Sequence, residues 1–152
     1  MKKVLLLFIF LIISTLSFAV EFEAQLGKSA KGAYTFITLD HPVSTLQAES
    51  FSGNNVYNAS FLVLGGGVLS SSQFEEQKMK LIVYSELNGG TFGIAESSFS
   101  GRAGVSTEGG LYLGVRYDFS VFLIGGSIGV DSLSKGNERM FGASFGMKVG
   151  FY

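Results

Sequence analysis

The sequence predicts an all-β fold: an antiparallel up-and-down transmembrane β-barrel of eight to ten strands, preceded by a cleavable signal peptide. The observations behind this prediction are an alternating final strand, an export-type N-terminus and alternating segments between them. In the final strand, residues 141–151, every odd position is apolar and every even position is glycine, serine or lysine. Successive side chains of a strand point to opposite faces, so one face is bulky and the other is small or polar. A small face suits a crowded barrel interior, and a bulky apolar face suits contact with lipid.

The N-terminus has the three parts of a secretory signal. Two lysines follow the first methionine, Val4 to Ile13 is an unbroken apolar run, and Ser17-Phe18-Ala19 offers small residues to a signal peptidase. We expect cleavage after Ala19, which makes residues 1–19 a signal peptide and residues 20–152 one β-barrel domain. The alternative is an uncleaved membrane anchor, although serine and threonine interrupt the apolar run before it reaches the length of a bilayer span.

The composition excludes several classes of protein. The chain has no cysteine, which excludes a disulfide scaffold, a thiolate metal site and a lipoprotein anchor. A net charge of −1 provides no basic surface for nucleic acid. After the N-terminus, no apolar run approaches the length of a membrane helix, so a membrane-spanning form must use the strands of a closed barrel.

Alternating segments and turn signals follow one another along the chain. We expect strands over residues 21–26, 33–39, 44–51, 56–65, 78–87, 111–119, 121–131 and 141–151, with the stretch 91–107 forming either one long strand or two. Dividing that stretch near Phe99-Ser100-Gly101 gives ten strands, which we favour over nine because single-chain bacterial barrels have even strand numbers. Eight strands remain possible if weak segments fuse or drop out.

The expected breaks between these strands are marked by glycine, proline and asparagine. Asp40-His41-Pro42 should end the second strand because proline cannot donate to a ladder. Residues 66–77 should form a loop or a short helix after Gly65, and Asn88-Gly89-Gly90 should form a hairpin turn. Further turns are expected at residues 52–55 and 107–110, near Ser120, and over residues 132–138.

Residues 21–152 resemble the small outer-membrane β-barrel proteins of Gram-negative-type bacteria, such as the opacity and attachment-invasion families. The resemblance rests on the export signal, the alternating strands, the tight turn Tyr117-Asp118-Phe119-Ser120 and the C-terminal aromatic residue. It implies a location in the cell outer membrane, contact with its lipid and insertion by the barrel-assembly machinery, with no indication of an extracellular partner. The chain departs from the family pattern in having no tryptophan, so phenylalanine and tyrosine must build any aromatic girdle. It also departs at Tyr152, which is out of phase with the apolar face, whereas Phe151 is in phase.

Four charged residues on the small faces form a candidate interior cluster: Glu96, Arg102, Arg116 and Asp118. A turn near Phe99 would place Glu96 opposite Arg102, and the following hairpin would place Arg102 opposite Arg116. We expect a ribbon of alternating acid and base that satisfies these charges inside a narrow barrel. The alternative is a proton or ion path, but side chains usually fill the interior of a barrel of this size, which favours the structural role.

No enzyme signature is found in the sequence. His41, the only histidine, needs a nucleophile and an orienting group, and the nearby Asp40 and Ser44 are ordinary turn residues. One histidine and one carboxylate do not define a metal site. The glycines at 65–67 lack the lysine and hydroxyl residue of a phosphate-binding loop. We therefore expect no catalytic, cofactor-binding or metal-binding residue and no nucleic-acid partner.

Two main functions remain open. The first is a small integral outer-membrane barrel with a filled interior and a structural or surface-interaction role. The alternative is a secreted soluble β-barrel or sandwich that binds an apolar ligand, in which case Phe145, Phe122 and Leu113 would point inward. A third, minor alternative is a subunit of a secreted β fibre.

Overall fold

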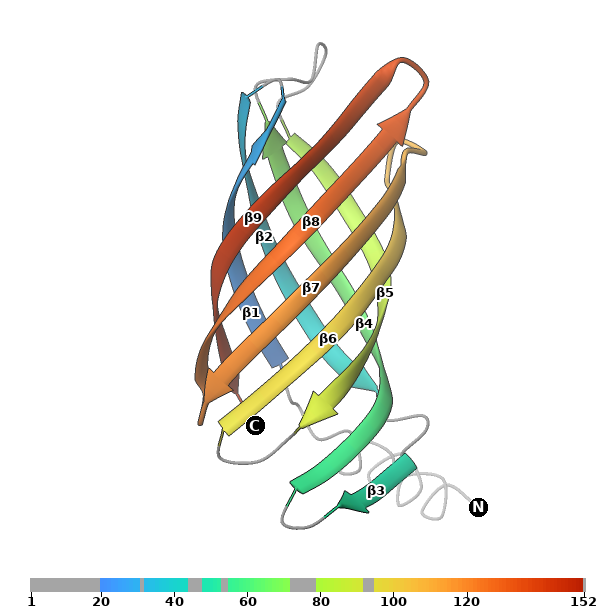
Figure 1. Cartoon of the computed structure of the whole chain (residues 1–152). Coiled ribbons are helices and arrows are strands. Elements are labelled where there is room, and N and C mark those ends of the chain that lie inside the picture. Colours follow the sequence, from blue (N-terminus) through green and yellow to red (C-terminus); the bar gives the residue numbers. More distant parts are fainter. Residues whose placement is uncertain are drawn as a thin grey trace, which may run out of the picture.

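The protein is an antiparallel β-barrel in the computed structural model, which describes residues 20–30, 32–43, 48–52, 55–71, 79–91 and 95–151. Its strands are β1 (Val20–Ser29), β2 (Gly32–Val43), β3 (Ala48–Ser52), β4 (Asn55–Ser71), β5 (Met79–Thr91), β6 (Ala95–Ser106), β7 (Leu111–Val121), β8 (Ile124–Lys135) and β9 (Glu138–Phe151). Their order is β2-β1-β9-β8-β7-β6-β5-β4-β3, and an additional pairing of β2 with β4 closes the wall (Figure 1). The predicted signal peptide, residues 1–19, lies outside the described residues and stays a prediction.

Eight strands form the barrel, so the favoured count of ten is wrong. Within the stretch 91–107, which was expected to divide near Phe99, residues 95–106 form the single strand β6, which pairs continuously with β5 and β7. The weak third strand is the short β3, which pairs with the first five residues of β4 and lies beyond the barrel wall (Figure 1). An unbroken ladder on both sides of β6 satisfies its backbone groups, which leaves no reason for the chain to turn there.

Three segments that were expected to break strands lie inside them. Asp40-His41-Pro42 is part of β2, and Asn88-Gly89-Gly90 is part of β5, where it pairs with residues 98–100 of β6. Gly66 and Gly67, which begin the loop or short helix expected over residues 66–77, are part of β4 and pair with both β2 and β5. Residues 72–77 of that expected break lie outside the described residues. Glycine in a strand also marks a place where a neighbouring group approaches closely. A side chain at Gly65 would clash with the ring of Tyr84, so this glycine accommodates packing inside the barrel rather than a turn.

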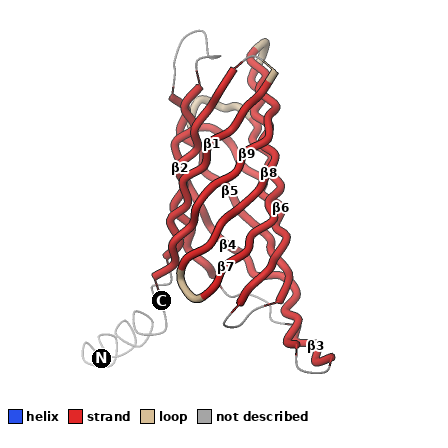
Figure 2. The backbone as a smooth tube through the Cα atoms, turned by 60° about the vertical axis from the view of Figure 1, so that its left-hand side comes forward, coloured by secondary structure: helices blue, strands red, loops and turns tan. Residues whose placement is uncertain are grey.

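Three of the other predicted turns fall close to their predicted positions, whereas the centre of the turn predicted at 52–55, residues 53–54, lies outside the described residues. The turn at residues 107–110 is confirmed, and Gly109 adopts a φ of 89°. The expected loop over residues 132–138 narrows to a two-residue turn at 136–137. The turn expected near Ser120 lies at residues 122–123, where Phe122 has a φ of 56°. We call the rim where β1 ends and that carries the turns at 107–110 and 136–137 the turn end, and the opposite rim, where β1 begins and β9 ends, the termini end (Figure 2).

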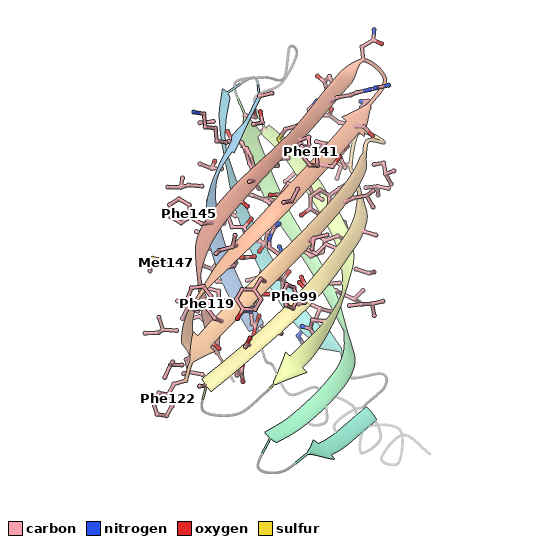
Figure 3. The ribbon with its side chains drawn as sticks, in the orientation of Figure 1. Phe99, Phe119, Phe122, Phe141, Phe145 and Met147 are labelled. Carbon is pink, nitrogen blue, oxygen red and sulfur yellow. The ribbon has the colours of Figure 1, made fainter. Side chains whose placement is uncertain are left out.

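Large apolar side chains cover the outside of the wall, and the buried charged side chains lie inside it. Phe141, Phe145 and Met147 are 66–69% exposed, and Figure 3 shows them projecting from the outer face of β9. Glu23 and Arg116, on the inner face, are buried. The predicted assignment of bulky and small faces is therefore confirmed for the final strand.

The same exposure contradicts the inward placement of bulky side chains on which the soluble alternative depends. That alternative requires Phe145, Phe122 and Leu113 inside, but they are 66%, 71% and 49% exposed. No helix within the described ranges is long and apolar enough to cross a membrane.

Candidate functional site: the barrel interior

Glycines on the inner face leave room for large side chains from neighbouring strands. The ring of Tyr34 covers Gly142, where an added Cβ would lie 2.6 Å from the ring. The guanidinium of Arg116 covers Gly129, where an added Cβ would lie 2.7 Å from Cζ. The small residues of the alternating pattern thus position the large polar residues that fill the barrel.

The guanidinium of Arg102 on β6 binds carboxylates from three other strands. Its Nη2 donates to Glu23 Oε2 of β1 at 2.9 Å and to Asp40 Oδ2 of β2 at 3.1 Å. Its Nε donates to Glu86 Oε2 of β5. The guanidinium also lies 4.9 Å from the ring centroid of Tyr84. Because these ion pairs are buried, they tie β1 and β2 to β5 and β6 across the lumen.

Arg116 on β7 forms a second buried centre. Its Nη2 donates to Asp131 Oδ1 at 2.5 Å and to Gln25 Oε1 at 2.6 Å. Asp131 also accepts hydrogen bonds of 2.8 Å from the hydroxyls of Tyr34 and Tyr112. The two arginines and their partners form what we call the ionic layer: Glu23, Gln25, Asp40, Glu86, Arg102, Arg116 and Asp131.

An apolar plug fills the lumen between the ionic layer and the turn end. Its residues are Tyr34, Phe36, Leu69, Ile82, Tyr84, Tyr112, Leu133 and Met140, each at most 5% exposed. The ring of Phe36 lies 5.4 Å from that of Tyr112 and 6.4 Å from that of Tyr84, both edge-on. The tyrosines of the plug donate to carboxylates of the ionic layer, so the apolar and charged parts form one continuous packing.

Further ion pairs lie at both ends of the lumen. At the turn end, Lys80 Nζ lies 2.6 Å from Glu108 Oε2 and 3.2 Å from Glu138 Oε2. The hydrogen bond from Lys80 lowers the pKa of the Glu108 carboxyl, which belongs to the turn outside the strands. At the termini end, Lys148 Nζ lies 2.9 Å from Glu21 Oε2.

The four predicted cluster residues lie on the inner side but do not form the expected ribbon. Arg102 and Arg116 belong to the ionic layer, and buried Asp118 lies 3.6 Å from Lys148. Glu96 is half-buried near the termini end and accepts a 3.2 Å hydrogen bond from a serine of β7.

Two expected pairings within the cluster are wrong. Glu96 and Arg102 both belong to β6 because the chain does not turn near Phe99. Arg102 faces Gly114, and Arg116 faces Ser100, because the hairpin register differs by two residues from the expected one.

The main partners of the arginines were not among the predicted residues. Glu23, Glu86 and Asp131 lie in phase with other inward positions, so strict extension of the alternation along each strand would have found them. Asp40 gave no such signal, since proline two residues later suggested a turn. His41 is half-buried on β2, and Ser44 lies outside the described residues. Within the described part of the chain, no group of three or more His, Cys, Asp or Glu side chains could hold a metal ion.

A closed eight-stranded barrel whose interior is filled by side chains, with its charges buried inside and an apolar outer wall, defines a class of protein that is built to lie in lipid. No protein-family model and no curated protein matches the sequence. Among solved structures, the chain is similar to one described as the outer membrane enzyme PagL, with a TM-score of 0.57 and 12% identity. The similarity covers 85% of this chain and 98% of that one, and at this identity it shows the shared fold alone.

Proposed function

We propose that the chain is an exported, integral outer-membrane β-barrel that is closed to solutes and acts as a structural component or through its surface turns. The apolar outer wall is the main observation that supports this proposal. Each of the eight barrel strands carries at least one exposed large apolar side chain, such as Leu26 on β1, Leu64 on β4 and Phe145 on β9, which are 51–66% exposed. A soluble monomer does not tolerate a continuous apolar surface of this extent, whereas lipid solvates it. The finer placement in the opacity and attachment-invasion families rests on the sequence resemblance.

We further propose that the protein is not an enzyme. The charged groups of the ionic layer bind one another: Arg102 holds three carboxylates and Arg116 holds Asp131. Both guanidiniums are at most 4% exposed, which leaves a substrate no access to them. This arrangement supports a role for the charges in holding the barrel together.

Fractionation of the native cell envelope tests the location. The protein should be recovered with the outer membrane, and the folded form should migrate faster than the boiled form on a gel. A chain expressed without residues 1–19 should stay in the cytoplasm, which serves as the control for export. Recovery of the mature protein as a folded, monodisperse species in plain buffer would contradict the proposal.

Planar-bilayer recording tests closure. The wild-type barrel should show no stable large conductance, because the apolar plug and the ionic layer occupy the lumen and eight strands enclose only enough space for side chains. Empty bilayers and a porin of known conductance serve as the negative and positive controls. A reproducible open channel would instead support the ion-path role for Arg102 and Arg116.

A further inference from the structure

In the described part of the barrel, the outward-facing charges lie at one rim. Among the Asp, Glu, Lys and Arg residues of the described barrel strands, two lie in phase with the lipid-facing side chains, namely Lys28 and Arg139. Lys28 continues the outward series of Phe22 and Leu26 on β1, and it is exposed. Arg139 continues the outward series of β9 and is also exposed. Both are cations, whereas the carboxylates of these strands lie in the inward phase.

Each cation is the outward charged residue nearest the turn end on its own strand. Lys28 is one residue from the end of β1, and Arg139 is the second residue of β9. Two residues after Arg139 comes Phe141, which is 69% exposed on the outer face of β9 (Figure 3). The strands β1 and β9 are neighbours, and Lys28 pairs with Ala143. On each strand the outward series therefore changes from apolar to cationic toward the turn end, after Leu26 on β1 and beyond Phe141 on β9.

We propose that Lys28 and Arg139 form a docking surface for the phosphate headgroups of anionic membrane lipids, a proposal that rests on the membrane location proposed above. An exposed cation at the level of the headgroups attracts an anionic leaflet. The guanidinium of Arg139 can bind two phosphate oxygens, and the ammonium of Lys28 supplies a point charge. The outward positions at the opposite rim of the same strands are Val20, Phe22 and Phe151, so the surface binds anionic lipid at the turn end.

Lipid titration of the folded barrel in zwitterionic detergent tests this surface. Phosphatidylglycerol and phosphatidylcholine with the same acyl chains are added, and bound lipid is counted by native mass spectrometry. Wild type should prefer phosphatidylglycerol, and Lys28→Gln or Arg139→Gln should each weaken that binding about fivefold. The double variant should weaken it roughly 25-fold, while affinity for phosphatidylcholine stays unchanged. Inorganic phosphate at matched ionic strength should not displace the lipid.

Matched variants distinguish specific lipid binding at Lys28 and Arg139 from the effect of losing any positive charge. Lys135→Gln removes a cation from the same rim, but Lys135 lies in the inward phase, 3.5 Å from Glu108, and its loss should change binding less than twofold. The swap Lys28→Arg with Arg139→Lys should retain the preference for phosphatidylglycerol. Equal binding of the two lipids by wild type, or full binding by the double glutamine variant, would overturn the docking surface. Heat-modifiability of the same samples measures separately whether the barrel is folded. A folded barrel without the lipid preference would refute the docking surface and would not contradict the proposed membrane location.

Discussion

Replacement of Arg102 by methionine is expected to destabilise the barrel by about 3–5 kcal/mol or to prevent its folding. The arginine is 4% exposed and is the shared partner of Glu23, Asp40 and Glu86. Its removal leaves three buried carboxylates without their counter-charge. Urea unfolding in zwitterionic vesicles, followed by the gel shift of the folded band, measures the effect. Arg139→Met is the matched control, since that arginine is exposed at the rim, and its effect should stay within about 0.5 kcal/mol.

A combined variant shows whether the loss of stability in Arg102→Met comes from the buried carboxylates that are left without a counter-charge. Arg102→Met together with Glu23→Gln, Asp40→Asn and Glu86→Gln removes the charges along with their partner, so part of the lost stability should return. A result for Arg102→Met as small as that of Arg139→Met would mean that the ion pairs of the lumen contribute little to stability.

Phe145→Arg is expected to cost about 2–4 kcal/mol, whereas Phe145→Leu should be mild. Phe145 is 66% exposed, and it pairs with Leu26 on β1 and Ile128 on β8, which also face outward. An arginine at this level places charge in the hydrocarbon, and a leucine only changes the shape that lipid tails must fit. Folding yields and urea unfolding in vesicles measure both variants.

The adjacent residue provides the inward control for the same strand. Gly146→Leu should cost about 1–3 kcal/mol or block assembly, because an added Cβ would lie 2.6 Å from both Ala24 O and Gln25 Cγ. If Gly146→Leu folds normally while Phe145→Leu fails, the two faces of β9 are assigned the wrong way round.

The sequence by itself determined which face of a strand meets lipid. Side-chain direction alternates along a strand as a local property of the backbone, so Phe141 and Phe145 reveal their face without any knowledge of their neighbours. The same local rule places Arg102 and Arg116 on the inner side. It was enough to establish the class of fold and the candidates for the interior charges.

Only the tertiary structure decided the strand number, the register and the partners of those charges. Gly65–Gly67 and Asn88–Gly90 show the limit of the local signal, since glycine marks a turn and a close approach inside a strand equally well. Whether a glycine forms a turn or a close contact depends on the residue that lies opposite it. Opposite Gly65 lies Tyr84, from the neighbouring strand β5. Likewise, Arg102 pairs with Glu23, 79 residues away, because closure of the barrel brings β1 across the lumen from β6. Contacts of this kind depend on long-range strand pairing, which side-chain alternation along a single strand does not encode.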